Sequence, residues 1–552
     1  MPVVDLYAEP GRASTPAALS PCDVVIIGTG PAGATVAAEL ADGPQRVTIL
    51  DSGGFQRRED ADHLNDIENV GRPRVPVQSW VRNRVVGGSS DTWDGRVAPF
   101  DAIDYEKRDW VPMSGWPLDR DDLTPYLTRA APHLGLAVTE EYSDERFWDL
   151  APAAKLAVLP DPALLLPFYW QFSRDPKERY RFEMMRFGRH VVDHLGPQQT
   201  LITGATALRV ELTADGSAVR AVAFAAPDGT VHEIETSAVV LATGGIENAR
   251  LMLASAETDP RVLGEGSDHV GRYLMDHLRG RVGTFDVKKA WPMRRVMGRH
   301  TAQDSMFSAG MRLSPDLQRS EHLLNASVWF KEHPAADDPW QAMRHFARGV
   351  GSRGKHLKNL VKGAGLLVRG MRDYLQRGIA TNRKLDELEV LVMIEQVPDP
   401  DSRVTLSDVR DQFGQRLPRV EWRSHPDEAA TVRRVAHLYA SEIARMGFPA
   451  PQLEPWVEAG DPLPDTWVDV AHPTGTTRMS AGPEDGVVDT YGQVHGVAGL
   501  YCAGSSVFPT AGHCNPTQMI VALSVRTADA VRDIPVRSSY AVEEAAASDP
   551  VA

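Results

Sequence analysis

The chain has 552 residues, a length that predicts two or three domains, and its apolar fraction of 42% and charged fraction of 24% are those of a globular protein. The formal net charge of −15 argues against a nucleic-acid partner, because a phosphate backbone requires a basic protein face. The acidic balance would suit a cationic substrate such as an amino sugar, or it serves only to keep molecules apart by like charge.

The three cysteines, Cys22, Cys502 and Cys514, are too few and too far apart for a metal site, so we expect no bound metal. Cys22 and Cys502 are interpreted as buried packing residues, and Cys514 as a packing residue or a redox-sensitive thiol. The N-terminus lacks the basic and apolar segments of a signal sequence, and no apolar run reaches the ~18 residues of a membrane span. These features predict a cytoplasmic protein without a transmembrane segment.

Residues 1–20 are rich in Pro, Ala and Ser and predict a flexible arm. A strand–turn–helix–strand unit follows. Residues 22–27 form a short apolar run typical of a buried strand, residues 34–40 supply small helical residues, and residues 47–50 form a second strand.

The turn of this unit carries the pattern Gly-x-Gly-x-x-Gly. Gly28 would make the tight turn, Gly30 would let the backbone approach a pyrophosphate, and Gly33 would let helix and strand pack closely. Asp51 ends the second strand about 20 residues further on, where a carboxylate can accept ribose hydroxyls. The motif predicts a dinucleotide site but does not distinguish FAD from NAD.

Residues 84–90 read Arg-Val-Val-Gly-Gly-Ser-Ser. Two glycines followed by two small hydroxyl residues permit close approach of a large planar ligand and leave amide donors nearby. A loop without a ligand is the alternative interpretation.

Further strands are predicted in the middle and near the end of the chain. Alternating patterns predict antiparallel strands at 201–210 and 219–231. Buried strands are predicted at 238–243, before Gly244 and a helix, and at 500–503, before Gly504 and Ser505.

Two long segments, at about 100–195 and 286–464, are rich in aromatic residues and His and are the expected walls of a substrate pocket. Residues 353–384 place Lys and Arg among Leu and Val at helical spacing. This basic amphipathic pattern fits a membrane or partner contact, a lid, or a solvated helix face.

Two motifs near the C-terminus carry the predicted chemistry. His472 begins His-Pro-Thr-Gly-Thr-Thr-Arg-Met, and Asn515 lies in Phe-Pro-Thr-Ala-Gly-His-Cys-Asn-Pro-Thr-Gln. A neutral imidazole is a suitable acceptor for a hydroxyl proton because its unperturbed pKa is ~6.5. The Asn515 amide can donate to the substrate oxygen. His513 is a rival candidate two residues away, and Pro516 suits the first turn of a helix.

Together these segments resemble the glucose–methanol–choline (GMC) flavin oxidoreductases from about residue 20 to about residue 535. In that family a His and a His or Asn meet over the flavin, and His472 and Asn515 match those two positions, whereas His513 is offset from them. The Gly-Gly-Ser-Ser segment matches the family sequence that lies along the flavin, so the resemblance implies FAD. Thr92 stands where members with covalently bound flavin have His, which implies a non-covalent cofactor.

The resemblance implies a mixed α/β (α+β) fold with two domains. A discontinuous Rossmann-like FAD-binding domain would contain residues 21–100, 196–285 and 465–535, and an antiparallel-sheet substrate-binding domain would contain residues 101–195 and 286–464. Residues 536–552 predict a disordered tail. The implied cofactor-binding residues are Gly28, Gly30, Gly33, Asp51, Ser52, Gly87, Gly88, Ser90, Trp93, Ala207, Ala242, Thr243, Gly244, Gly504, Ser505, Asn515, Pro516 and Thr517.

Three residues of the long segments are candidates for substrate contact. Trp170 and Gln171 belong to a run that mixes aromatic surface with hydrogen-bonding groups, which suits a sugar ring, although a packed core strand explains the run as well. Gln396 lies in a family-like stretch and could reach the substrate, although a structural strand is the favoured interpretation. Residues 270–277 are also family-like and are expected to have a structural role.

The sequence therefore predicts FAD-dependent oxidation of an alcohol to an aldehyde or ketone, with His472 as base, Asn515 holding the oxygen, and hydride transfer to flavin N5. A sugar or glycoside, including an amino sugar of natural-product biosynthesis, is the leading substrate class. A sterol or aliphatic alcohol oxidase, a GMC-like lyase with a structural flavin, and a flavoprotein without turnover remain alternatives. The electron acceptor, O2 or another molecule, is left open.

Overall fold

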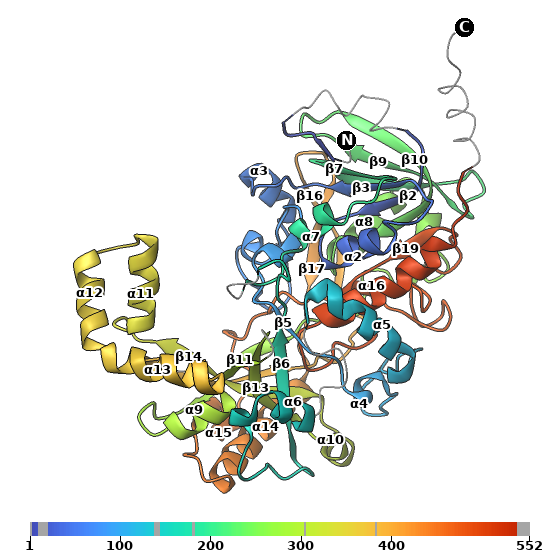
Figure 1. Cartoon of the computed structure of the whole chain (residues 1–552). Helices are drawn as coiled ribbons and strands as arrows, with labels where there is room; N and C mark the ends of the chain where they lie inside the picture. The colour runs from blue at the N-terminus through green and yellow to red at the C-terminus, as the bar shows by residue number, and fades with distance from the viewer. Residues whose placement is uncertain are drawn as a thin grey trace.

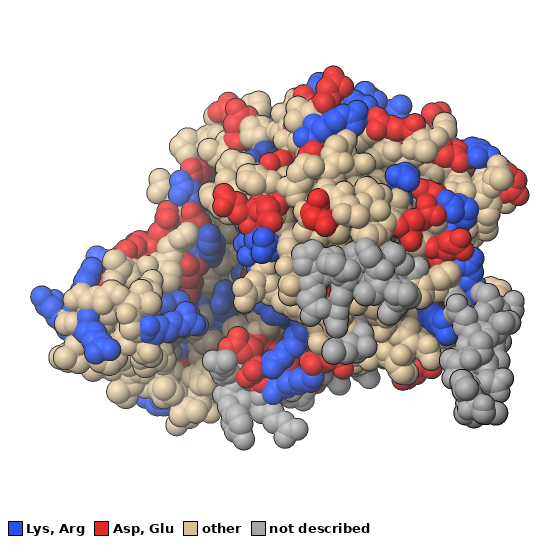
Figure 2. Space-filling model, turned by 90° about the horizontal axis from the view of Figure 1, so that it is seen from above, with Lys and Arg blue, Asp and Glu red and all other residues tan. Residues whose placement is uncertain are grey.

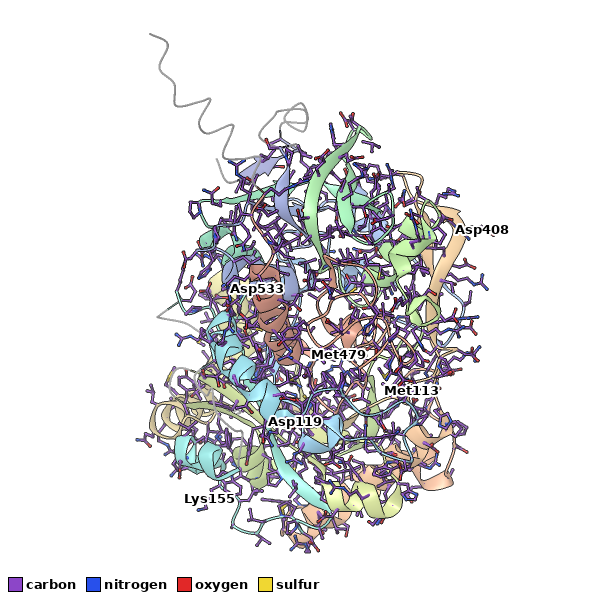
Figure 3. All side chains as sticks on the ribbon, turned by 90° about the vertical axis from the view of Figure 1, so that its right-hand side faces the viewer. Met113, Asp119, Lys155, Asp408, Met479 and Asp533 are labelled. Atoms are coloured by element: carbon purple, nitrogen blue, oxygen red, sulfur yellow. The ribbon has the colours of Figure 1, made fainter. Side chains whose placement is uncertain are left out.

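The computed structural model describes residues 3–8, 20–136, 144–178, 183–302, 305–380 and 383–537. Within these ranges the chain forms two eight-stranded sheets and a small three-stranded sheet. The two large sheets lie one above the other in Figure 1, with segments from both ends of the chain in the upper layer. Met479, only 2% exposed, is buried in the interior of the molecule (Figure 3).

The first sheet has a core of parallel strands. The predicted strand–turn–helix–strand unit supplies two of them. Its parallel strands are β1 (Val3–Asp5), β7 (Gln199–Thr203), β3 (Val47–Asp51), β2 (Cys22–Ile27), β10 (Val231–Leu241) and β19 (Leu500–Cys502). Alternate β2 residues are buried in different clusters: Val24 and Ile26 pack with α2 (Pro31–Glu39) and α16 (Thr517–Arg532), whereas Val25 and Ile27 pack on the side of α8 (Glu247–Ala256). Burial on both faces explains the continuous apolar run in the sequence.

The predicted strand at 201–210 is two strands in the structure. The chain breaks at Gly204, whose φ of +75° favours glycine. β7 precedes the break in the parallel core. After it, β8 (Thr206–Leu212) pairs antiparallel with β9 (Val219–Ala225), which pairs with the first half of β10. The predicted strand at 219–231 likewise ends early and turns through Gly229, whose φ is +85°.

Part of the predicted flexible arm belongs to this sheet. β1 pairs with β7 in the register Val3↔Leu201, Leu6 is fully buried, and the Tyr7 hydroxyl donates to the Ser52 carbonyl oxygen at 2.9 Å. Apolar residues at 3, 4 and 6 explain this order, because their burial stabilises the edge strand. Residues 9–19 of the arm and residues 538–552 of the predicted tail lie outside the described residues.

The second sheet is antiparallel. Its order is β18 (Gln452–Leu453), β11 (Leu278–Thr284), β15 (Leu385–Ile394), β14 (Ala326–Pro334), β13 (Ser305–Leu313), β6 (Leu165–Phe172) and β5 (Arg96–Val97), and β12 (Arg299–Ala302) pairs with β13. One face packs against α14 (Pro426–Arg445) through residues such as Val392 and Tyr439. The opposite face carries Trp170, Trp329 and Met393, which are buried with residues of the first sheet. β5 and β11 come from ranges assigned by sequence to the cofactor domain, so this sheet draws on both predicted units.

The remaining elements surround these two layers. The third sheet consists of β16 (Arg403–Arg410), β17 (Arg416–Glu421) and β4 (Glu68–Asn69). The other α-helices are α3 (Glu59–Asp62), α4 (Ala102–Tyr105), α5 (Arg120–Leu134), α6 (Asp144–Leu150), α7 (Phe187–Asp193), α9 (Trp291–Met297), α10 (Pro315–Glu321), α11 (Pro339–Arg348), α12 (Arg353–Lys362), α13 (Ala364–Arg377) and α15 (Pro455–Ala459).

Helices α11, α12 and α13 project from the body between β14 and β15 (Figure 1). The predicted basic helix at 353–384 is divided at Gly363, where an added Cβ would lie 2.4 Å from the Pro339 side chain. Lys and Arg side chains stand out on this projection in the space-filling view (Figure 2). Among the helices that the structure describes, none combines the length and apolarity needed to cross a membrane.

Candidate active site

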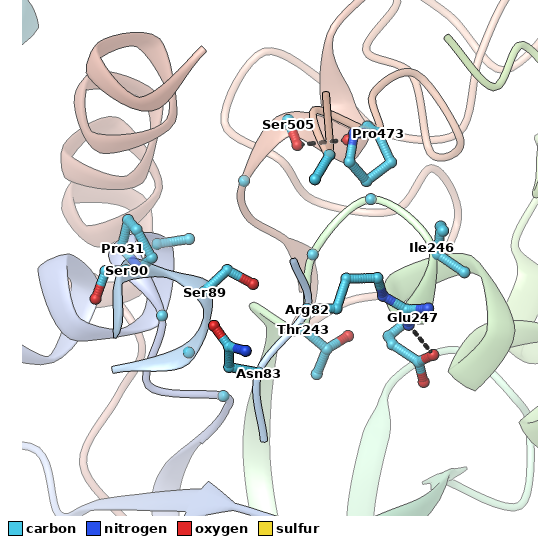
Figure 4. Close-up of a pocket in the computed structure, with 18 of the residues that line it drawn as sticks. Pro31, Arg82, Asn83, Ser89, Ser90, Thr243, Ile246, Glu247, Pro473 and Ser505 are labelled. Atoms are coloured by element: carbon cyan, nitrogen blue, oxygen red, sulfur yellow. Dashed lines mark hydrogen bonds and ion pairs between the residues drawn. The ribbon is translucent and has the colours of Figure 1, made fainter. Parts of the chain in front are cut away.

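A cavity of about 450 Å³ connects the predicted cofactor motifs with the C-terminal pair. Figure 4 shows how separate loops surround it, with Pro31, Ser89 and Thr243 on different segments of the chain. All the predicted cofactor-binding residues except Gly33 and Gly87 line this cavity, and His472 lines it too. The volume is in the range of small-molecule sites.

The glycine-rich turn after β2 has the close approaches expected of it. Gly28 has a φ of +101°, and an added Cβ would lie 2.6 Å from the Ala242 carbonyl oxygen. An added Cβ on Gly33 would lie 1.9 Å from the Gly28 carbonyl oxygen, so only glycine permits this contact. Gly30, in contrast, has nothing within 4 Å of an added Cβ and faces the cavity. Open space at the N-terminus of α2 fits a phosphate-bearing ligand.

Asp51 ties the two glycine-rich segments together. Its carboxylate accepts hydrogen bonds from the backbone N–H of Thr29 at 3.0 Å, from the Thr29 hydroxyl, and from the Gly53 N–H at 2.8 Å. The Thr29 hydroxyl oxygen in turn accepts from the Gly87 N–H at 2.8 Å. Burial raises the pKa of Asp51, against the opposing effect of these hydrogen bonds.

The Gly-Gly-Ser-Ser segment lies directly against the turn. An added Cβ on Gly88 would be 3.1 Å from the Gly30 Cα. Thr92 donates its hydroxyl hydrogen to the Asn83 side-chain oxygen at 2.6 Å. Trp93 lines the cavity, and its indole N–H donates to the Met185 carbonyl oxygen at 2.8 Å. Trp93 therefore combines a structural contact with a place in the cavity wall.

Sequence reasoning missed a charged cluster at the cavity edge. Glu247 forms ion pairs with Arg82 at 2.6 Å, Arg84 at 3.1 Å and Arg250 at 2.7 Å, and the Arg82 pair is drawn in Figure 4. Burial opposes ionisation of Glu247, but the three arginines hold its pKa well below the ordinary value. Arg84 also donates to the Ser52 hydroxyl oxygen at 3.0 Å. Three guanidinium groups around one carboxylate leave a cationic edge that suits an anionic dinucleotide.

His472 and Asn515 meet at the other end of the cavity. The distance from His472 Nε2 to Asn515 Nδ2 is 3.4 Å. The backbone N–H of His472 donates to Asp276 at 3.0 Å. Asp276 is held by the buried Arg74 at 2.9 Å, and Arg74 also pairs with Asp469 at 3.0 Å. A buried ionic network thus fixes the backbone on which His472 stands.

His277 determines which nitrogen of His472 carries the proton. His277 Nε2 lies 3.0 Å from the Gly512 carbonyl oxygen, which can only accept, so Nε2 is the donor. Nδ1 of a neutral His277 is then an acceptor, and it lies 3.1 Å from His472 Nδ1. His472 must therefore donate from Nδ1, which leaves the Nε2 lone pair directed toward Asn515.

The electrostatic surroundings keep this pair neutral. Burial lowers the pKa of His472 well below its usual range, and the neighbouring His277 and Arg279 lower it further. Burial also lowers the pKa of His277. A neutral His472 is the protonation state that a general base requires. Residues 270–277, expected from the sequence to be structural, therefore include a direct neighbour of the candidate base.

The N-terminus of α16 lies next to Asn515. Pro516 is the residue before the first helical position, and Thr517 begins the helix. Ser505 donates its hydroxyl hydrogen to the Pro473 carbonyl oxygen at 2.7 Å, which links the two C-terminal motifs (Figure 4). Free backbone N–H groups at this helix end can stabilise negative charge in the cavity.

His513 does not line the cavity. It is fully buried, with Nδ1 at 3.4 Å from Asp104 and 3.1 Å from the Asn325 amide nitrogen. Burial disfavours its protonation, but Asp101 and Asp104 raise its pKa above the ordinary value. This ionic packing anchors the loop that carries Asn515 and separates His513 from the candidate reaction site.

The three predicted substrate residues do not line the cavity either. Trp170 is fully buried, with its ring 5.0 Å from that of Trp329. Gln171 is fully buried and donates to the Ser305 hydroxyl oxygen at 3.2 Å. Gln396 accepts from the Trp422 indole N–H at 2.7 Å and from the Asp276 N–H at 2.8 Å. The side chains of Gln171 and Gln396 thus bond to protein groups, whereas no described residue pairs with the buried Trp170 indole nitrogen.

Comparisons with known proteins agree with this architecture. Residues 398–524 match the family model described as GMC oxidoreductase. The chain is 25% identical to 2-methyl-1,2-propanediol dehydrogenase of Mycolicibacterium austroafricanum over 92% of its own length and 94% of that protein. It is 24% identical to paromamine 6'-oxidase of Streptomyces fradiae, covering 92% of this chain and 91% of that one.

A solved structure has the same overall fold. A variant of formate oxidase from Aspergillus oryzae RIB40 superposes with a TM-score of 0.54 at 18% identity, covering 93% of this chain and 98% of the other. At this identity the similarity establishes the fold, with its mixed sheet and helix layers, and not the substrate.

Proposed function

We propose that this chain, a GMC-type oxidoreductase, oxidises an alcohol group of a small molecule to an aldehyde or ketone with His472 as the base. The observation that carries the proposal is the Nε2 lone pair of His472, directed at Asn515 inside the same cavity as the glycine cradle. Alcohol oxidation by hydride transfer needs a cofactor site and a neutral base in the same cavity, and both features are present here.

The residues of the cavity fit FAD, which accepts the substrate hydride when it is bound. Asp51 would hold the ribose, the open face of Gly30 and the adjoining Gly88 would admit the pyrophosphate, and the N-terminus of α16 would face the ring end. We propose that the cofactor is held without a covalent bond, because Thr92 has no nucleophilic nitrogen and its hydroxyl group is engaged by Asn83.

The proton step follows from the tautomer of His472. The substrate hydroxyl gives its proton to His472 Nε2 while the carbon–oxygen double bond forms and the carbon-bound hydrogen leaves as hydride. The Asn515 amide donates to the substrate oxygen and so directs its hydrogen toward His472. The resulting imidazolium keeps its hydrogen bond from Nδ1 to His277, which limits the reorganisation needed on protonation.

A sugar or glycoside is the proposed substrate class, with a sterol or aliphatic alcohol as the alternative. Two relatives are named as a dehydrogenase of a diol and as an oxidase of paromamine, which supports an alcohol substrate for this chain. The proposed electron acceptor is O2 or another oxidant. A cytoplasmic location also remains a proposal, supported by three buried free cysteines.

Anaerobic rapid mixing of the flavin-loaded protein with an alcohol panel tests this function. A substrate should bleach the flavin absorbance, and His472→Ala should slow the bleaching by at least ~10²-fold while FAD content stays unchanged. Asn515→Ala should slow the same step because an unheld oxygen spoils the geometry. His63→Ala is the matched control, since the His63 side chain is 66% exposed and does not line the cavity.

The alternatives predict different results. A lyase or a flavoprotein without turnover would leave the flavin oxidised with every alcohol tested. A His472→Ala protein that bleaches as fast as the His63→Ala protein would exclude His472 as the base.

A further inference from the structure

Three arginines lie on one face of the second sheet, and one of them, Arg279, reaches the cavity. Arg279 lines the cavity together with His472 and Asn515. Arg96 and Arg299 lie on β5 and β12 of the same sheet. We refer to Arg96, Arg279 and Arg299 as the arginine cluster.

The strand register places all three on the same side. Arg96 pairs with Phe172, and Arg299 pairs with Ser308, which pairs with Trp170. Direct partners in antiparallel strands point to the same face, as do residues two apart along a strand. Arg279 pairs with Met393, which is buried in the cluster that contains Trp170. This face is the one turned toward the first sheet.

Two arginines of the cluster, Arg96 and Arg299, lie over aromatic rings of β6. The Arg96 guanidinium carbon lies 5.4 Å from the Trp170 ring centroid and 5.6 Å from that of Phe172. The Arg299 guanidinium carbon lies 5.3 Å from the same Phe172 ring. Arg96 and Arg299 therefore flank one aromatic side chain, which fixes their positions without neutralising their charges.

Carboxylate partners for this charge are few. Asp94, whose side chain is 58% exposed, lies 3.5 Å from Arg96 Nε. Among the residues that the structure describes, Arg279 and Arg299 have no carboxylate within ion-pair distance. Most other arginines near the cavity are paired, as Arg82 is with Glu247. Asp276 and Glu332 act on Arg279 and Arg299 only from beyond ion-pair distance, so the cluster keeps an excess of positive charge beside one exposed carboxylate.

The surrounding protein makes this excess unfavourable. Burial lowers the pKa of Arg96, Arg279 and Arg299, and Asp94 opposes this effect at all three. Arg279 further lowers the pKa of Arg96, and Arg96 lowers that of Arg299. An arginine does not lose its proton in a protein, so the charge persists and an anion is the group that relieves it. A protonated amino sugar would meet charge of its own sign here.

We propose that the substrate is an anionic alcohol of the sugar-acid class. Its carboxylate binds Arg279, with Arg96 and Arg299 adding positive charge from the same sheet face, while its hydroxyl reaches His472 and Asn515. The proposal rests on the proposed function, because it assigns a substrate class to the same cavity. A planar carboxylate matches the paired N–H donors of a guanidinium group. A phosphate ester offers similar oxygens, and a comparison of glucuronate with glucose 6-phosphate distinguishes the two groups.

Binding can be measured without turnover by the change in flavin absorbance when a ligand enters the cavity. Glucuronate, glucose and glucosamine offer nearly the same ring with negative, neutral and positive charge, and glucose 6-phosphate supplies the phosphate. Glucuronate should bind at least about tenfold more tightly than glucose, as expected for a charge-assisted contact, and glucosamine should bind most weakly. The preference should shrink as salt is added.

Variants assign the preference to its residues. Arg279→Gln should remove most of the difference between glucuronate and glucose, and Arg279→Lys should restore part of it. Arg281→Gln is the matched control: Arg281 is on the same strand but pairs with Glu387 at 3.0 Å and Glu454 at 2.7 Å. It should keep the full preference, and thermal melting should show that all variants are folded.

Two outcomes would overturn the proposal. Glucuronate binding no tighter than glucose removes the anionic substrate, and a preference for glucose 6-phosphate alone replaces the carboxylate with a phosphate. The measurement is separate from the test of function. A failure of alcohol to bleach the flavin would overturn the proposed function without changing the binding order, whereas bleaching without an anion preference would overturn only the present proposal.

Discussion

At the scale of single residues, the candidate base depends on a neighbour that carries no obvious motif. His277 accepts from His472 Nδ1 only because its own Nε2 hydrogen is held by the Gly512 carbonyl oxygen. The effect is to fix one tautomer of His472 and one orientation of its ring. His277 is a positioning residue, since it acts through His472 and does not line the cavity.

Replacing His277 should change both the rate and the pH dependence of flavin reduction. His277→Leu removes the acceptor, so we expect reduction to slow by roughly tenfold or more as the productive tautomer is lost. The substitution also removes a group that lowers the pKa of His472. Burial, the largest cause of the low pKa of His472, remains in the leucine variant, so the acid limb of the kcat/KM profile should move upward only part of the way toward the ordinary histidine value.

The wild-type profile provides the comparison. Because the pKa of His472 is lowered, the base stays neutral as the pH falls, and activity should persist well below pH 6.5, the ordinary value. His277→Gln retains an acceptor and should lie between the wild type and His277→Leu. An unchanged acid limb in the leucine variant, with intact FAD binding, would show that His277 only fills space.

Local motifs and long-range contacts differ in how far the sequence reveals them. Gly28, Gly30 and Asp51 could be predicted because each role depends on spacing within one short segment. The charged partners Arg82 and Glu247 could not, since they are far apart in sequence and meet only when two loops surround the cavity. Gln396 could not be placed because an isolated strand does not reveal which neighbours take its hydrogen bonds.

At the scale of elements, backbone geometry accounts for the differences from prediction. The strand expected at 201–210 follows an alternating pattern that continues through Gly204, so periodicity alone does not show the break. The basic segment at 353–384 is helical as expected, but Gly363 divides it where Pro339 packs against the chain. Both errors arise from contacts made by residues distant in sequence.

The long helix α14 contains a carboxyl group that should limit stability. Glu428 is buried, and burial raises its pKa to about 8. Its Oε1 accepts from the Gln396 amide and the Val397 N–H, both at 3.3 Å. Since the folded pKa exceeds the unfolded value, its contribution to stability is complete below the unfolded pKa and is lost as the pH rises through the folded pKa.

Glu428→Gln should therefore stabilise the protein in a pH-dependent way. The gain should be near zero at pH 4 and reach about 3 kcal/mol by pH 7, at about 1.4 kcal/mol per pH unit of difference. Denaturant unfolding at several pH values measures it. Asp427→Asn, at an exposed neighbouring position, should show no such growth. An equal effect of Glu428→Gln at pH 4 and pH 8 would contradict this account.

At the scale of the whole molecule, the cavity is the place where distant parts of the chain converge. Its lining comes from the first strand–turn–helix unit, from the β10–α8 junction and from both C-terminal motifs, and the second sheet contributes Arg279. A ligand bound in this cavity contacts segments from nearly the full length of the chain. Its binding energy should therefore stabilise the folded molecule as a whole.

Removal of FAD tests that coupling and the mode of attachment together. Thr92 provides no nitrogen for a covalent bond, so acid precipitation should release yellow flavin into the supernatant and leave the protein colourless. Protein freed of FAD under mild, non-denaturing conditions should then melt at a lower temperature than the loaded form. At a cofactor concentration ~10³ times Kd, the lost stabilisation is about 4 kcal/mol, which lowers Tm by roughly 4 °C for a chain of this length.

Adding FAD back should restore the original Tm. Adding riboflavin, which lacks the pyrophosphate and ribose groups expected near Gly30 and Asp51, should restore much less. Flavin that remains on the precipitated protein would refute non-covalent attachment, and an unchanged Tm after complete removal would show that the cavity is not coupled to the stability of the fold.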